Sequence, residues 1–409
     1  MTTPAKLEAD WLSAPASRSV IDALQARRPG SARFVGGCVR NALMGRPVDD
    51  LDIATQLPPD AVMEALKAAG IRAIPTGIDH GTVTAVIGGE GIEITTLRRD
   101  VETDGRRAVV AFTEDWAEDA ARRDFRLNAL YVTPDGTLHD PTGGGIADAA
   151  AGRVIFIGDA DQRLKEDYLR ILRFFRFNAW YGAEMDAAGL AACERQKAGL
   201  AQIAAERVWK EFRKLLAAPR PGAAVQAMQE TSVLAAIIGD DLGGAHRTVR
   251  LVAAERAAGE APDPMRRLLT LVPGSQGWID QFAGRLRLSR SDHGRLSAWA
   301  NPDLPAVGAG PPAAIRAALY RYGAEAVLDR ALVEHARSNA PVTEPFLSLV
   351  RTWTPPRFPL GGADAKAAGL TGPAIGEALR AAEARWIDSD FQSNRQDLQV
   401  RLAAHRNEP

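Results

Sequence analysis

Residues 33–55, RFVGGCVRNALMGRPVDDLDIAT, decide the fold that we predict for this chain. An apolar run ends at Gly36-Gly37, where the backbone can approach a ligand closely because no Cβ intervenes. Residues 39–44 favour one or two helical turns, which Gly45 can end. The segment that follows, Asp49-Asp50-Leu51-Asp52-Ile53-Ala54-Thr55, has the apolar residues of a strand. The stretch therefore predicts a glycine turn, a short helix and a strand that carries carboxylates.

The aspartates of this strand indicate a metal site. Side chains alternate between the faces of a strand, so we expect Asp50 and Asp52 on one face and Leu51 and Ile53 in the core. Two carboxylates at this spacing can bind hard divalent cations such as Mg²⁺. The glycine turn and Arg40 would suit a triphosphate. An aspartate pair alone favours a solvated acidic turn, but the ordered set of Gly-Gly, Arg, Gly and Asp-x-Asp favours a metal-dependent nucleotidyl-transfer site.

The composition predicts a folded protein with a sizeable core. The chain has 409 residues, 46% of them hydrophobic, which is enough for about two to four domains. A formal net charge of −1 does not indicate a nucleic-acid binder, so any basic surface must be local. The two cysteines exclude a disulfide scaffold and fit a reducing compartment. Without a signal-peptide pattern or an apolar run of membrane-spanning length, we expect a soluble, cytoplasmic protein with no membrane partner.

The first hundred residues predict a small sheet mixed with helices. Helical spacing covers residues 1–30 and 59–69, and residues 71–75 read as a short strand. The alternating runs at residues 81–87 and 91–97, joined by Gly88-Gly89-Glu90, predict a hairpin. Glu93 lies on a strand that should neighbour the aspartates. It is a candidate third catalytic carboxylate or an ordinary strand-surface residue.

The middle of the chain adds polar residues to apolar segments. Residues 98–121 are charged and predict a long surface loop, either solvated or functional. In the segment that follows, Arg122, Arg123, Asp124 and Asn128 would be costly to bury unless they are paired. A nucleotide could pair them, with arginine on phosphate and Asp124 on ribose hydroxyls, and a salt-bridged helix start is the alternative.

A glycine run and two helices follow. Residues 143–145 are three glycines, which suit a hinge or a plain turn, and residues 153–157 read as a strand. Residues 166–177, EDYLRILRFFRF, predict one helix with Glu166, Arg170 and Arg173 on one face and Asp167 a turn from Arg170. Such donors and acceptors can read the Watson–Crick edge of a base. A salt-bridged amphipathic helix is the generic alternative. The amphipathic helix at residues 205–216 could support the first helix or contact RNA phosphates.

Five sequence blocks in this order resemble the class II tRNA nucleotidyltransferases, the CCA-adding enzymes and bacterial poly(A) polymerases of the polymerase-β-like superfamily. They span residues 33–216, about half the chain. The blocks are Gly36-Gly37-x-Val39-Arg40 with Asp50-x-Asp52; Arg122-Arg123-Asp124-Phe125 with Asn128-Ala129-Leu130; Asp140 with Gly143 to Gly145 and Asp148; Glu166-Asp167-x-x-Arg170; and Glu206-Arg207 with Trp209-Lys210-Glu211.

The resemblance implies an α+β nucleotidyltransferase head with a small mixed sheet, followed by an all-α neck, body and tail. We expect the catalytic head at residues 1–150, the neck with nucleotide-template helices at 151–220, the body at 221–300 and a tRNA-binding tail at 301–409. Past residue 220 the chain reads as helices, with expected helices at 223–234, 244–258, 265–271, 280–299 and 377–386.

The resemblance also implies roles for single residues. Asp50 and Asp52 would hold two Mg²⁺ ions, and the block from Arg122 would recognise ribose. The block at Glu166, Asp167 and Arg170 would select CTP and ATP for addition to the 3′ end of tRNA. The glycine run would act as a hinge, and the helix with Glu206 would steady the template helix. The implied nucleotide-binding set is Gly36, Gly37, Arg40, Arg122, Arg123, Asp124, Asn128, Glu166, Asp167, Arg170 and Arg173.

Other activities are possible for a chain with these blocks, and two positions differ from the pattern that is usual in the family. A poly(A) polymerase or an enzyme that adds only A would use the same head, whereas the charged segment at 98–121 argues against addition of CC alone. A non-catalytic RNA-binding module and a small-molecule nucleotidyltransferase are further alternatives, disfavoured by the aspartates and by the template block. Asn41 stands where the family usually has Asp, and Arg126 where it usually has Thr. The oligomeric state is not indicated.

Overall fold

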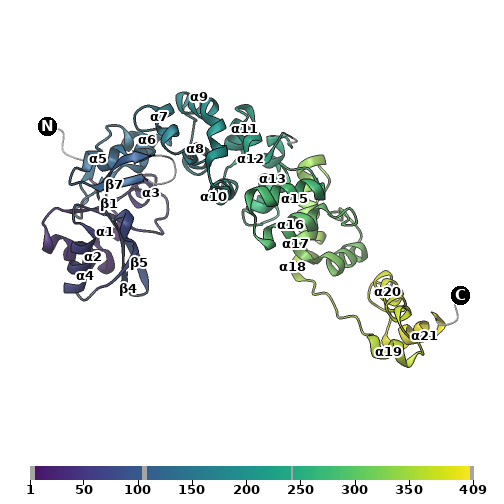
Figure 1. Cartoon of the computed structure of the whole chain (residues 1–409). Helices are drawn as coiled ribbons and strands as arrows, with labels where there is room; N and C mark the ends of the chain where they lie inside the picture. The colour runs from purple at the N-terminus through teal and green to yellow at the C-terminus, as the bar shows by residue number, and fades with distance from the viewer. Residues whose placement is uncertain (1–4, 104–107, 241–242, 406–409) are drawn as a thin grey trace. The chain divides into compact units, whose positions relative to one another are not determined.

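The computed structural model describes residues 5–103, 108–240 and 243–405 (Figure 1). The chain divides into two compact units, residues 1–239 and 240–409. The first unit holds a mixed sheet and the helices around it, and the described residues of the second unit form helices and connecting loops but no strand. This arrangement confirms the predicted α+β head followed by helices.

A seven-stranded sheet forms the framework of the first unit, with strand order β3-β4-β5-β2-β1-β8-β9. Strands β2 and β5 are parallel and the other neighbours are antiparallel. The hairpin predicted near residues 81–97 is present as β4 and β5. The strand bounds are β1 Ala32–Val35, β2 Asp52–Thr55, β3 Arg72–Gly77, β4 Thr82–Ile87, β5 Glu90–Thr96, β8 Tyr131–Val132 and β9 Leu138–His139.

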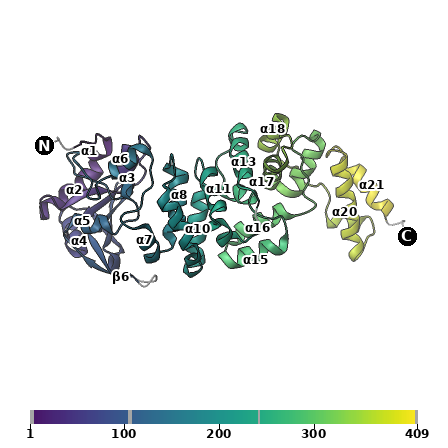
Figure 2. The same cartoon turned by 90° about the horizontal axis from the view of Figure 1, so that it is seen from above.

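Helices α2 and α4 lie side by side against this sheet (Figures 1 and 2). Both carry apolar residues at helical spacing, and the core beneath includes the fully buried Phe34, Ile53 and Ile94. The helices of this unit are α1 Asp10–Ser13, α2 Pro15–Arg27, α3 Gly37–Leu43, α4 Pro59–Ala68, α5 Trp116–Ala121, α6 Gly145–Ala151, α7 Ala160–Glu166, α8 Leu169–Tyr181, α9 Ala187–Gln196, α10 Ala205–Leu216, α11 Gly222–Glu230 and α12 Val233–Ile238. Short 3₁₀ helices are η1 Ile78–His80, η2 Arg126–Asn128 and η3 Lys197–Gln202.

The segment at residues 98–121 is not the loop that the sequence predicts. It forms a two-stranded sheet, β6 Arg98–Thr103 with β7 Ala108–Phe112, and then helix α5. Strand pairing satisfies backbone groups that a loop would leave to water. Asp115 caps α5 by accepting a hydrogen bond from the amide of Ala117 at 2.7 Å.

Two further elements differ from the prediction. Residues 153–157 form no continuous strand, because only Arg153 and Phe156 make isolated bridges, to Glu184 and Phe125. The helix predicted over residues 166–177 is divided into α7 and α8 by Asp167, whose backbone is extended at φ −152°. The Asp167 carboxylate accepts a hydrogen bond from the Leu169 amide at 3.0 Å. This local bond competes with helix continuation and starts α8 afresh.

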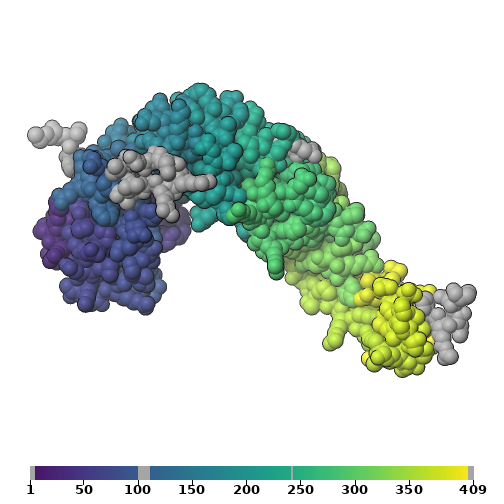
Figure 3. Space-filling model, in the orientation of Figure 1, coloured from purple at the N-terminus to yellow at the C-terminus, as the bar shows by residue number. Residues whose placement is uncertain are grey.

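Hydrophobic clusters hold the helices of the second unit together. One lies among α13, α17 and α18, and another joins α19, α20 and α21, which are gathered in one lobe, yellow in Figure 3. The helices are α13 Ala245–Ala257, α14 Pro264–Leu269, α15 Gln276–Leu286, α16 Arg290–Ala300, α17 Pro312–Ser338, α18 Glu344–Thr352, α19 Gly362–Ala367, α20 Pro373–Asp388 and α21 Arg395–His405. The predicted helices at 223–234 and 280–299 are each divided in two, at Ser232 and Arg287, whose φ angles are positive. In the part of the chain that the structure describes, no helix is both long and apolar enough to cross a membrane.

Candidate active site

The glycine turn lies where β1 ends and α3 begins. Gly36 has φ +74°, a conformation that favours glycine, and its amide donates to the Leu130 carbonyl at 3.1 Å. A Cβ built on Gly36 would lie 3.7 Å from Nη1 of Arg123. Glycine here permits both the turn and the close approach of this arginine.

Asp52 begins strand β2 and lies directly beside Glu93 of β5 in the parallel register. The neighbour relation predicted for Glu93 is therefore present. Burial, and next the charge of Glu93, raise the pKa of Asp52 to about 6, and Asp50 contributes in the same direction. Asp50 itself precedes β2 in an exposed loop, so the prediction that both aspartates lie on the strand is wrong. The strand starts two residues later than the apolar pattern indicates.

Arg40 of α3 is buried, with 6% of its surface exposed, among neutral partners. Its Nη1 donates to Oδ1 of Asn128 at 2.6 Å and its Nη2 to the Tyr181 hydroxyl at 2.9 Å. Oδ1 of Asn41 accepts from Nε and Nη2 at 3.1 and 2.8 Å. Burial lowers the pKa of Arg40, as expected for a cation taken out of water.

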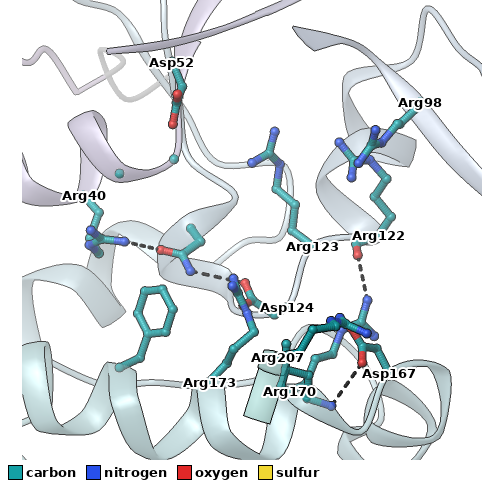
Figure 4. Close-up of a pocket in the computed structure, with 15 residues that line it drawn as sticks. Arg40, Asp52, Arg98, Arg122, Arg123, Asp124, Asp167, Arg170, Arg173 and Arg207 are labelled. Atoms are coloured by element: carbon teal, nitrogen blue, oxygen red, sulfur yellow. Dashed lines mark hydrogen bonds and ion pairs between the residues drawn. The ribbon is translucent and has the colours of Figure 1, made fainter. Parts of the chain in front are cut away.

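A cavity of about 490 Å³ gathers most of the predicted site residues (Figure 4). Its wall carries seven arginines and only three aspartates, so it suits an anion. The lining residues are Gly36, Gly37, Arg40, Asp52, Arg98, Arg122, Arg123, Asp124, Asn128, Asp167, Leu169, Arg170, Arg173, Phe177 and Arg207. The predicted residues Asp50, Glu93 and Glu166 lie outside this lining.

The block around Asp124 fixes one side of the cavity. Asp124 accepts from Nε of Arg173 at 2.7 Å and from Nδ2 of Asn128 at 3.2 Å (Figure 4). Burial alone would raise the pKa of Asp124, but the Arg173 guanidinium holds it below its usual value. Asn128 connects this pair to Arg40. One hydrogen-bonded chain thus runs from α3 to α8.

The break between α7 and α8 places Asp167 and Arg170 at the cavity. Arg170 pairs with Glu166 at 2.5 Å, and its Nη2 donates to the Arg122 carbonyl at 3.2 Å. Oδ2 of Asp167 accepts from Nη2 of Arg207, on α10, at 2.8 Å (Figure 4). Glu166 therefore orients Arg170, as predicted, although the two residues belong to different helices.

Several lining residues were not predicted. Arg98 begins strand β6, just after the predicted hairpin, and Arg207 lies on the helix that was interpreted only as a support or an RNA contact. Leu169 and Phe177 supply apolar wall. The sequence did hold a signal for both arginines: Arg98 closely follows the strand that carries Glu93, and Arg207 belongs to the last of the five recognised blocks.

Asn41 and Arg126, the two residues that differ from the usual family pattern, both have polar partners in the structure. Asn41 accepts from Arg40, and its Nδ2 donates to the Pro47 carbonyl at 2.8 Å. Arg126 pairs with the fully buried Asp148 at 2.7 Å, and Arg153 contacts the same carboxylate at 3.1 Å. A Cβ on Gly144 would lie 3.0 Å from Nη1 of Arg126, so this side chain lies against the glycine run.

Three comparisons with known proteins agree with this geometry. Residues 32–155 match the family model of the poly A polymerase head domain, and residues 184–239 match the model described as the probable RNA and SrmB-binding site of polymerase A. The mitochondrial CCA tRNA nucleotidyltransferase 1 of Danio rerio is 33% identical over 394 residues, which cover 90% of this chain and 85% of the relative.

Bacterial relatives give the same result. The CCA-adding enzyme of Geobacillus stearothermophilus is 35% identical over 294 residues, 68% of this chain and 70% of that enzyme. The crystal structure of the Bacillus stearothermophilus CCA-adding enzyme in complex with CTP superposes with a TM-score of 0.77 at 27% identity, covering 96% of this chain and 98% of that one. The chain therefore belongs to the CCA tRNA nucleotidyltransferase family and is a nucleotidyltransferase.

Proposed function

We propose that this enzyme adds C, C and A to the 3′ end of tRNA, using CTP and ATP without a nucleic-acid template and releasing pyrophosphate. The observation that carries the proposal is a single cavity that holds Asp52, an excess of arginines and the pair Asp167 and Arg170. Figure 4 places Asp52 and this pair at opposite ends of the cavity. One end would serve the reaction and the other would select the nucleotide.

The triphosphate would lie between the glycine turn and the arginines. Arg40 brings a positive charge whose hydrogen bonds in the described structure go to neutral groups. Arg123 lies over Gly36, where a phosphate could also accept from backbone amides. These groups would hold the α-phosphate for in-line attack by the terminal 3′-hydroxyl, so catalysis would come mainly from positioning and charge stabilisation.

The base would be read by Asp167 and Arg170. A carboxylate and a guanidinium offer acceptors and donors that can match the Watson–Crick edges of cytosine and adenine. Glu166 and Arg207 hold these two side chains in place. A fixed pair of protein groups would make a nucleic-acid template unnecessary.

The donor set around Asp52 fits Mg²⁺. Asp50 and Asp52 would hold two ions, and Glu93 lies next to Asp52. Burial, and next the charge of Glu93, raise the pKa of Asp52, and a bound cation would favour its charged form again. Within the described residues, no group of three or more His, Cys, Asp or Glu side chains is arranged to hold a metal, so the proposed ions would need further ligands from phosphates and water. Bound Mg²⁺ would lower the pKa of the 3′-hydroxyl and stabilise the leaving pyrophosphate.

The test is an addition assay. The purified protein is incubated with Mg²⁺ and a tRNA that lacks its 3′ end, with CTP, ATP or both, and the products are sized. Two added residues with CTP alone and three with both nucleotides support the proposal. A long ladder with ATP alone would instead identify a poly(A) polymerase, and a single residue added only to tRNA ending in CC would identify an A-adding enzyme.

The other expectations from the sequence are part of this proposal and stay predictions. The division into a head at 1–150, a neck at 151–220, a body at 221–300 and a tail at 301–409, with tRNA contacts on the tail, stays a prediction. The hinge role of residues 143–145 and the cytoplasmic location also stay predictions.

A further inference from the structure

Asp119 of helix α5 is a buried carboxylate on which several cavity groups converge. Its side chain is 1% exposed. Oδ1 accepts from Nε and Nη2 of Arg122 at 2.8 and 2.7 Å, and Oδ2 accepts from Nε and Nη2 of Arg123 at 3.2 and 3.0 Å. The Tyr131 hydroxyl donates to Oδ2 at 2.7 Å, and the backbone amide of Arg98 donates to Oδ1 at 3.3 Å.

Through these contacts Asp119 binds three of the arginines that line the cavity, although it does not line the cavity itself. Arg98, Arg122 and Arg123 line the cavity, whereas Asp119 does not. Both Arg122 and Arg123 use Nε and Nη2 on the carboxylate, which leaves Nη1 of each guanidinium outside this pairing. Nη1 of Arg123 is the atom that lies over Gly36. A planar guanidinium held on one edge presents its other edge in a fixed direction.

Asp119 carries a negative charge in the folded protein. Burial would raise its pKa, but Arg123 and Arg122 outweigh that effect and hold the pKa at about 2. The carboxylate therefore stays ionised throughout the physiological range and keeps both guanidinium groups in place.

We propose that Asp119 is a positioning residue for nucleotide binding, which aims Arg122 and Arg123 at the phosphates of the incoming nucleotide. The inference rests on the proposed function only in taking a nucleoside triphosphate as the ligand. Asp119 contributes no atom to the cavity and acts through the two arginines.

Asp119→Asn tests this role. The amide keeps the size of the side chain but replaces one oxygen with an NH₂ donor and removes the charge, so Arg122 and Arg123 can no longer each bind an oxygen of their own. Equilibrium binding of CTP and of inorganic tripolyphosphate is measured with Mg²⁺ and without tRNA. Since Asp119 acts on the phosphates, we expect both ligands to bind about tenfold more weakly, by the same factor.

Asp329→Asn is the matched control. Asp329 is also 1% exposed and accepts from two arginines, Arg266 and Arg295, but these belong to the second unit and do not line the cavity. A general loss of stability would accompany both substitutions, whereas weaker binding should follow Asp119→Asn alone. Equal losses of affinity in the two variants would overturn the proposal, as would weaker CTP binding with unchanged tripolyphosphate binding.

Tyr131→Phe gives a second measurement if Asp119→Asn does not fold. It removes one hydrogen bond to Asp119 and no charge. We expect CTP and tripolyphosphate to bind about threefold more weakly, and unchanged affinity for both would contradict the proposal. Because these experiments need no tRNA, they give their answer even if the addition assay shows a different product.

Discussion

Two clusters of arginines and carboxylates lie in the two units of this protein, and they differ in charge balance. The cluster in the second unit consists of Glu255, Asp263, Arg266, Arg267, Arg295 and Asp329. Arg267 pairs with Glu255 at 2.9 Å, Arg266 with Asp329 at 2.8 Å, and Arg295 with both Asp263 and Asp329. Each cation in this cluster is matched by a carboxylate.

The cavity cluster has more arginines than carboxylates. Among the described residues its wall has seven arginines and three aspartates, and the two further carboxylates that pair with these arginines, Asp119 and Glu166, raise the number of carboxylates to five. Arg40 in particular is buried among neutral partners. Burying a cation without an anion is costly, so a surplus of this kind favours an anionic ligand. The matched cluster has a structural role, and the unmatched one is suited to binding.

The largest expected effect concerns Asp52, the cavity aspartate at the proposed metal site. Asp52→Ala removes the carboxylate on which the proposed Mg²⁺ depends, so incorporation should fall by a factor on the order of 10³ or more. The measurement is single-turnover incorporation of labelled CMP, with tRNA binding followed by gel shift. Binding should persist, because the substitution leaves the arginines in place.

Asp49→Ala is the control for this prediction. Asp49 lies in the exposed loop before β2 and does not line the cavity. Incorporation close to the wild-type rate in Asp52→Ala, or an equal loss in Asp49→Ala, would contradict the assignment.

The matched cluster should affect stability and not nucleotide binding. Asp329→Ala leaves Arg266 and Arg295 without their shared carboxylate, so the second unit should lose about 3 kcal/mol of stability. Urea unfolding measures this loss, and CTP affinity measured without tRNA should not change. Asp280→Ala, which breaks the exposed pair with His293, should leave the stability of the second unit almost unchanged. Weaker CTP binding in Asp329→Ala would remove the distinction between the clusters.

The template pair should control the choice of nucleotide. Arg170→Ala and Asp167→Ala each remove half of the proposed base-reading pair, so the preference between CTP and ATP should fall by about 10- to 100-fold. The measurement is the ratio of kcat/KM values on tRNA that lacks its 3′ end. Arg195→Ala breaks an exposed pair with Asp161 of α7 and should leave the ratio unchanged. Unchanged selectivity in the template variants would show that other groups read the base.

Much of this site could be predicted from the sequence because its residues fall in short blocks with local geometry. The glycine turn, the position of Glu93 beside Asp52 and the pairing of Glu166 with Arg170 all follow from alternation or from spacing. Asp50 was misplaced because the apolar run does not show where pairing begins.

The other differences between prediction and structure arise from interactions that the pattern of apolar and charged residues does not show. The break at Asp167 depends on a side-chain hydrogen bond that interrupts an otherwise helical pattern, and an aspartate just before an apolar helix was its only signal. The pairing of β6 with β7 was missed because the charged residues of β6 obscure the alternation that marks a strand. Asp119 was missed although it stands three and four residues before Arg122 and Arg123, a spacing that could have indicated the two ion pairs. Its contacts with Arg98 and Tyr131 come from separate elements and leave no signal in the sequence.

The smallest expected effect concerns Arg126, which connects the glycine run to the cavity. Arg126 belongs to the turn η2 that carries Asn128, and it pairs with buried Asp148. Arg126→Thr leaves Arg153 as the partner of Asp148, so the stability loss should be only about 1 kcal/mol. The turn would lose one of its ties, and Asn128 would hold Arg40 less precisely. We therefore expect KM for CTP and ATP to rise about threefold to fivefold, with kcat nearly unchanged.

Arg153→Thr separates this positioning effect from simple loss of a salt bridge. Arg153 contacts the same carboxylate, but it is more exposed than Arg126 and lies outside η2. If Arg126 acts through the turn, Arg153→Thr should lower stability by a similar amount and leave both KM values unchanged. Equal increases in KM for the two variants would mean that the charge balance at Asp148 matters and the position of Asn128 does not. In that case the contact between Arg126 and the glycine run would have no separate effect on how the cavity arginines bind the nucleotide.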